Sequence, residues 1–150
     1  MKLRRIIDND ILALLIRLTV GIIFIYASYY KIIDPQSFAK SIWFYHLVPG
    51  KLINIVAIIL PWIELTAGIG LILGVYYRGS VALVNILTLF FIIALSVAII
   101  RGISIDCGCF KAAAATSESA WETLRFDLCL IILTIFLIIS RSKRWMLSQP

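Results

Sequence analysis

Charged residues are scarce in this chain. Of its 150 residues only 15% are Asp, Glu, Lys or Arg, whereas 62% are hydrophobic, and the mean hydropathy is +1.03. A soluble domain of this length averages about 25% charged and about 45–50% apolar residues. Because a small domain leaves much of its surface in water, one soluble core cannot bury the excess. The composition therefore excludes a soluble globular domain and indicates a membrane protein.

Histidine and cysteine are also rare, with one histidine and three cysteines. These numbers are too small for a disulfide-rich scaffold or for a protein with several metal ions. The formal net charge is +6, but the basic residues lie at the chain ends and between apolar runs. They form no continuous basic face for nucleic-acid phosphates, so we expect the lipid bilayer and its anionic headgroups as the counterpart, and no nucleic acid.

Four long apolar segments predict membrane-spanning helices, because lipid offers no hydrogen-bond partners and each segment must satisfy its own backbone. The expected spans are residues 11–33, 52–76, 81–100 and 124–139. We therefore expect one all-α domain over residues 1–150, an integral membrane four-helix bundle.

Turn and cap signals separate these segments. Asp34-Pro35 ends the first span, because the residue before proline is disfavoured in a helix. Residues 36–51 are rich in aromatics and predict a short amphipathic helix along the membrane interface. Residues 77–80 predict a tight turn, and the spacing of Ser119 and Glu122 predicts a capping box at the start of the fourth helix.

Two glycines of the second span, Gly70 and Gly74, are spaced to let another helix approach closely. We interpret them as packing residues.

Four spans place both termini on one side of the membrane. Dense basic clusters lie beside the first and last spans, so the positive-inside rule predicts cytoplasmic termini. The basic start of the chain precedes an apolar run that is longer than in a signal peptide, so we expect the first span to be retained. The connection between the third and fourth spans is then extracytoplasmic.

That connection contains Cys107, Gly108 and Cys109. Two cysteines one residue apart close only a small ring, which has little freedom to reach normal disulfide geometry, and Gly108 is the residue most able to bend there. Strained or exposed disulfides are the labile, catalytic ones. The pair is thus interpreted as redox-active, with a structural disulfide or inert thiols as one alternative. A Cys₃His zinc site with Cys129 and His46 is the other, although the spacing does not predict it.

Two neighbours complete this candidate site. Cys129 lies about one turn into the fourth span, where it is expected either to resolve a mixed disulfide or to fill the bundle as a small apolar residue. Asp106 precedes the thiol pair, and an adjacent carboxylate raises a thiol pKa.

Glu64 lies inside the second span, where a charged side chain is costly and marks a functional site by default. Pro61 lies one turn earlier and frees a backbone carbonyl nearby. Arg17 and Lys31 of the first span are both candidate partners. Together with Asn85 of the third span, these residues predict a proton path or a quinone pocket, with a structural ion pair as the alternative.

Several motifs together resemble the DoxX-like superfamily, and within it the MauE branch of methylamine-utilisation membrane proteins. The matching residues are Arg17, Gly21-Ile-Ile-Phe24, Lys31-Ile-Ile-Asp34-Pro35, Phe38, Leu60-Pro61-Trp-Ile-Glu64, Gly68 and Arg101-Gly-Ile-Ser-Ile-Asp106-Cys107-Gly108-Cys109-Phe110. The resemblance covers nearly the whole chain, and its most specific element is Asp-Cys-Gly-Cys-Phe. The sequence departs from the family at Lys111, where relatives often have glycine.

The resemblance implies a four-helix protein of the bacterial inner membrane that handles thiols and disulfides outside the cytoplasm. It implies a periplasmic thioredoxin-like or disulfide-containing partner, in methylamine metabolism or a related pathway. We expect a thiol–disulfide redox protein, a possible oxidoreductase, that passes electrons to quinone. The alternative is a non-catalytic subunit that anchors a respiratory or dehydrogenase complex, and a weaker one is a small-molecule carrier.

Overall fold

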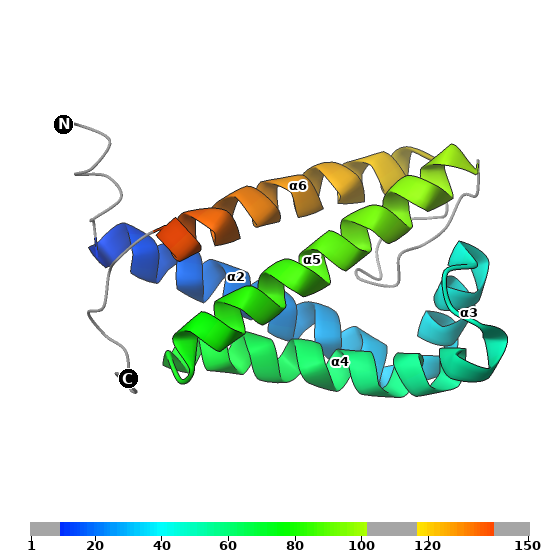
Figure 1. The fold of residues 1–150 in the computed structure, drawn as a ribbon, viewed down its shortest axis with the longest axis horizontal. Coiled ribbons are helices and arrows are strands. Elements are labelled where there is room, and N and C mark those ends of the chain that lie inside the picture. The colour runs from blue at the N-terminus through cyan, green and yellow to red at the C-terminus, as the bar shows by residue number, and fades with distance from the viewer. Residues whose placement is uncertain (1–9, 102–116, 140–150) are drawn as a thin grey trace.

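Helices account for nearly all of the structure that can be described. The computed structural model describes residues 10–101 and 117–139, which contain five helices and no strand (Figure 1). The helices are α2 (Asp10–Ile33), α3 (Pro35–Tyr45), α4 (Gly50–Leu73), α5 (Tyr77–Ile100) and α6 (Ser117–Ile139). The all-α class is therefore confirmed for this part of the chain.

Three of these helices, α2, α4 and α5, are long and apolar enough to cross a membrane. Each has 24 residues, which corresponds to a length of about 36 Å at 1.5 Å per residue, against a hydrocarbon core of about 30 Å. Helix α6 has 23 residues, but its first half contains Glu122, Arg125 and Asp127. Its crossing of the membrane stays a prediction.

The long helices pack around a shared apolar core. Helix α2 contacts α4 and α6, and α5 contacts the same two helices. The buried residues of α2 recur every three or four positions, as expected for one face of a helix. The opposite faces present apolar side chains such as Ile22, Ile58 and Ile86, which suits contact with lipid.

Helix α3 lies at one end of this arrangement, the end at which α5 stops and α6 starts (Figure 1). Its Phe38 and Ile42 pack against Ile53 and Ala57 of α4. The side chain of Asp34 caps α3 by accepting a hydrogen bond from the backbone amide of Ser37 at 3.1 Å. The end of the first span at Asp34-Pro35 and the short helix after it were both predicted correctly.

Helices α2 and α4 approach each other closely at Gly21 and Gly68. A Cβ atom on Gly68 would lie only 3.0 Å from the carbonyl oxygen of Gly21. The expectation of close helix packing is confirmed at Gly70 but not at Gly74. Gly74 ends α4 in the left-handed conformation with φ 69°, which favours glycine, and a Cβ on Gly70 would meet the Ser80 hydroxyl of α5.

Two predicted boundaries were also wrong. Helix α5 already begins at Tyr77, so the predicted turn at residues 77–80 lies inside it, and the chain reverses through Gly74 and Tyr76, both with positive φ. Helix α6 already includes Ser117, so Ser119 does not stand before the first turn as a capping residue would.

Candidate functional site

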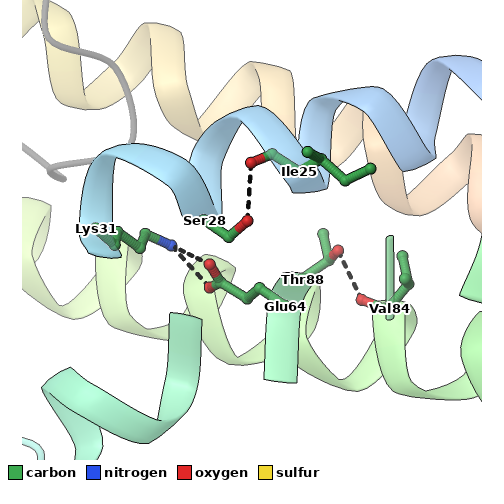
Figure 2. A network of polar contacts seen from close by, with 6 residues as sticks. All are labelled: Ile25, Ser28, Lys31, Glu64, Val84 and Thr88. Carbon is green, nitrogen blue, oxygen red and sulfur yellow. Dashed lines mark hydrogen bonds and ion pairs between the residues drawn. The ribbon is translucent and has the colours of Figure 1, made fainter. Parts of the chain in front are cut away.

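A buried ion pair joins α2 to α4. The Lys31 ammonium donates to both carboxylate oxygens of Glu64, with Nζ–Oε1 and Nζ–Oε2 distances of 2.7 and 2.9 Å (Figure 2). The two side chains are only 1% and 2% exposed. Removing two charges from water is costly, and it is offset only by close geometry of this kind.

Two aromatic rings cover the ammonium group. Lys31 Nζ lies 4.1 Å from the ring centroid of Phe91 in α5 and 5.0 Å from that of Phe38 in α3. An ammonium within about 6 Å of a ring face is attracted by the ring's quadrupole, most strongly when water is excluded. The charge of Lys31 is thus surrounded by groups from four helices, α2, α3, α4 and α5.

The register between α2 and α4 explains why Lys31 is the partner of Glu64. Gly21 lies between Arg17 and Lys31 in α2, and it contacts Gly68 of α4. Because the two helices run in opposite directions, Lys31 reaches toward Glu64 on one side of this contact. Arg17 lies on the other side.

Nearby hydroxyl groups are satisfied within their own helices. Ser28 donates to the carbonyl oxygen of Ile25 and Thr88 to that of Val84, each at 2.8 Å (Figure 2). Pro61, one turn before Glu64, is buried and has no amide hydrogen to donate within α4. These groups shape the surroundings of the ion pair and do not neutralise it.

A cavity of about 40 Å³ adjoins the pair. Its walls combine the two ion-pair residues with hydroxyl, carboxylate and apolar side chains from α2, α5 and α6. They are Ile23, Phe24, Ala27, Lys31, Glu64, Thr88, Phe91, Thr123, Phe126, Asp127 and Leu130. The ion pair is therefore bordered on the α6 side by a small cavity with both polar and apolar side chains in its wall.

Arg17 and Asn85 are not part of this site. Arg17 is buried, and its Nη2 atom donates to the carbonyl oxygen of Ile72 near the end of α4 at 3.0 Å. Asn85 donates to the Val81 carbonyl oxygen and accepts from the Thr134 hydroxyl of α6 at 2.9 Å. The predicted grouping of Glu64 with Arg17 and Asn85 was wrong, because Arg17 bonds to α4 near Ile72, away from Glu64, and Asn85 bonds to α6.

The thiol site falls largely outside the described residues. Asp106, Cys107, Gly108 and Cys109 belong to the segment 102–116, which is not described. Cys129 is a free cysteine on an exposed face of α6, so the interpretation that it fills the bundle was wrong. His46, a candidate zinc ligand, is an exposed residue in the left-handed conformation that ends α3.

Sequence reasoning missed Phe38, Phe91, Thr88 and Asp127 as neighbours of the ion pair. Phe38 follows Lys31 by seven residues, and Asp127 is a charged residue within a predicted helix. Both could therefore have been recognised from the sequence as neighbours of the ion pair. Phe91 could not have been recognised in this way, because it lies in a continuous apolar run.

Comparison with known proteins identifies the family of this chain. The family model described as "Methylamine utilisation protein MauE" matches residues 9–140. The chain belongs to the MauE family. The predicted MauE branch is thus confirmed, and the matched range includes every residue of the ion-pair site.

Two curated members of the MauE family are similar to this chain. A methylamine utilization protein MauE from Methylorubrum extorquens is 33% identical over 82 residues, which cover 54% of this chain and 44% of the relative. One from Paracoccus denitrificans is 27% identical over 97 residues, covering 64% and 52%. The chain therefore matches about half the length of these relatives. No solved structure matches.

Proposed function

We propose that this protein is a membrane thiol–disulfide redox protein of methylamine utilisation. Its Cys107–Cys109 pair exchanges disulfides with a thioredoxin-like or maturing partner protein outside the cytoplasm. The pathway follows the names of the MauE family and of its relatives, and the chemistry follows the two closely spaced cysteines.

One observation of the structure carries the proposal. The segment that contains the cysteines connects Ile100 of α5 to Ser117 of α6, and both helix ends lie at the α3 end of the molecule (Figure 1). The Lys31–Glu64 pair is in the same half, because Lys31 is two residues from the end of α2 and the cavity is lined by the first half of α6. A charged site inside a membrane protein is functional by default, and here it lies in the half of the molecule where α5 ends and α6 begins.

The proposed exchange transfers two electrons. A partner thiolate attacks one sulfur of the Cys107–Cys109 disulfide, which breaks the S–S bond and forms a mixed disulfide. The partner's second thiol then attacks the mixed disulfide, so the partner leaves oxidised and the Cys107–Cys109 pair is left as two thiols. A quinone reoxidises the pair by taking two electrons and two protons and becoming a quinol.

The proposed topology has four spans, with α6 as the fourth, in a bacterial inner membrane. Both termini are cytoplasmic and the thiol pair is on the outer side. The dense basic clusters next to the first and last spans support this orientation.

Thiol trapping in native membranes tests the proposal. We expect mass-tagged alkylation to find Cys107 and Cys109 oxidised, then reduced after addition of a dithiol protein, and reoxidised after addition of quinone. The variant Cys129→Ser removes the third thiol as a control and should leave this cycle unchanged. A pair whose labelling never changes would refute the redox function.

A second candidate function is a non-catalytic membrane subunit, and the exposed face of α6 favours it. Trp121, Glu122 and Arg125 are exposed there, whereas the exposed residues of the adjacent α5 after Val81 are uncharged up to Ile100. Charges beside lipid are costly unless a partner or the interface covers them. Under this function, the double variant Cys107→Ser/Cys109→Ser still co-purifies with a complex, and the thiols show no redox cycle.

A further inference from the structure

Two cavities share Phe91 in their walls, and of these two only the cavity beside the ion pair, referred to as the polar cavity, has charged wall residues. The cavity beside the ion pair, about 40 Å³ in volume, has walls that include Lys31, Glu64, Thr88 and Asp127. The second cavity, about 20 Å³, lies between α3, α4 and α5, and Phe91 is common to both. Apart from Tyr45 it is lined by apolar side chains: Phe38, Ile42, Leu47, Val48, Val56, Leu60, Phe90, Phe91 and Ala94.

This difference decides where water can reach the ion pair. A cavity needs roughly 10–15 Å³ to hold one water, and it holds water only if the water finds several polar partners, whereas apolar cavities stay dry. The polar cavity has room for about three waters by this measure, and although most of its wall is apolar, Lys31, Glu64, Thr88 and Asp127 offer polar partners. On the opposite side, the rings of Phe91 and Phe38 lie against the Lys31 ammonium.

The ionisable groups at the polar cavity come from three helices. Helix α2 contributes the Lys31 ammonium, α4 the Glu64 carboxylate and α6 the Asp127 carboxylate, while α5 contributes the uncharged Thr88 and Phe91. Helix α3 contributes the uncharged Phe38, which faces the ammonium. Glu64 and Asp127 both line this small cavity, and two carboxylates that interact take up protons as a pair.

We propose that the polar cavity is a proton-binding site within the membrane helices, shared by Glu64 and Asp127 and supplied with protons through water on the α6 side only. A proton arrives from a water molecule in the cavity and forms an O–H bond with one carboxylate, while Lys31 stays bound to Glu64. No electron moves in this step. The proposal goes beyond the thiol–disulfide function, because it needs neither Cys107 nor Cys109.

Infrared spectroscopy of the full-length protein in lipid nanodiscs tests proton binding. We expect the difference between spectra at acidic and neutral pH to contain a protonated-carboxyl band that loses at least half its intensity in both Glu64→Gln and Asp127→Asn. The matched control is Glu122→Gln, because Glu122 is an exposed carboxylate on α6 that does not line the cavity. Circular dichroism verifies that each variant keeps its helices.

A difference spectrum that stays unchanged in folded Glu64→Gln and in folded Asp127→Asn would overturn the proposal. Should Glu64→Gln fail to fold, Asp127→Asn decides the outcome alone, because Asp127 is not part of the buried ion pair. Since no thiol is involved, the expected bands persist in Cys107→Ser/Cys109→Ser, and a failed thiol-trapping experiment leaves this result independent.

Hydrogen–deuterium exchange of the same band tests the one-sided access. The substitution Phe91→Ala removes the ring shared by the walls of the two cavities, so we expect the carboxyl band to exchange several-fold faster in D₂O than in the wild type. The milder Phe91→Leu keeps a bulky apolar wall and should exchange at the wild-type rate. Equal rates in the wild type and a folded Phe91→Ala would show that the ring is no barrier and would overturn the one-sided route.

Discussion

Two of the interhelical polar contacts, Lys31–Glu64 and Asn85–Thr134, differ in what satisfies them. In the first, Lys31 and Glu64 carry opposite charges, use two aromatic rings and adjoin a polar cavity. In the second, the neutral side chains of Asn85 and Thr134 bond to each other, and Asn85 also bonds to a carbonyl of its own helix. The neutral contact joins two helices and needs nothing further, whereas the charged contact depends on four helices.

This difference separates a role in packing from a role in function. A neutral hydrogen bond between helices contributes little, about 0.6 kcal/mol on average, because unfolded helices in a membrane also find partners. A buried ion pair adds little net stability over apolar packing but is strongly destabilising when one partner is removed. Because its net stabilisation is small, the charged contact is the one that we expect to have a functional role. Three substitutions test the difference between the two contacts.

The largest effect is expected for Lys31→Ala. It leaves the Glu64 carboxylate without its buried partner, so the free energy of unfolding should fall by about 3–5 kcal/mol. Unfolding in a denaturing detergent, followed by circular dichroism, measures the change. The double variant Lys31→Met/Glu64→Leu is the control, and it should recover most of the loss because it removes both charges. A single variant as stable as the wild type would show that the pair does not restrain the fold.

An intermediate effect is expected for Gly68→Ala. The new Cβ would lie 3.0 Å from the Gly21 carbonyl oxygen, so α2 and α4 must separate, at a cost of about 1–3 kcal/mol. The separation should weaken the Lys31–Glu64 contact and leave the Asn85–Thr134 contact intact. The same unfolding measurement applies.

Gly79→Ala is the matched control for this substitution. No atom lies within 4 Å of a Cβ at Gly79, and alanine favours a helix, so stability should be unchanged or slightly higher. If both substitutions had the same effect, the Gly21–Gly68 contact would not determine the spacing of α2 and α4.

The smallest effect is expected for Thr134→Val, which removes the hydrogen bond to Asn85 and keeps the side-chain shape. The loss should be about 0.6 kcal/mol, the average for such bonds between membrane helices. Thr66→Val is the control, because Thr66 is exposed and bonds only to Ile63 of its own helix. A loss at Thr134 as large as that of Lys31→Ala would remove the contrast between the two contacts.

The helices were predictable because long apolar runs in a membrane protein have few alternatives to a helix. The end of the first span was predictable for a local reason, since Asp34-Pro35 both ends α2 and caps α3. The turn after α4 was displaced, because Tyr76 adopts a left-handed conformation that its residue type does not announce.

The site was predictable only in part. The cost of a charge in lipid marked Glu64, Lys31 and Arg17 from sequence alone. The choice between the two basic residues depended on where α2 crosses α4, and therefore on the contact between Gly21 and Gly68. The ring of Phe91 reaches the ammonium only through packing of α5, which no local pattern encodes.

The single-residue break at Asp34 also bears on the order in which the protein is made. Lys31 is synthesised before Glu64. The lysine therefore has no carboxylate partner from α4 until that helix has been made. Because α3 follows α2 directly, Phe38 is available to the ammonium 26 residues before Glu64 is synthesised. The aromatic ring is thus the earliest shield of the lysine during biogenesis, and the carboxylate that completes the site arrives with the next helix.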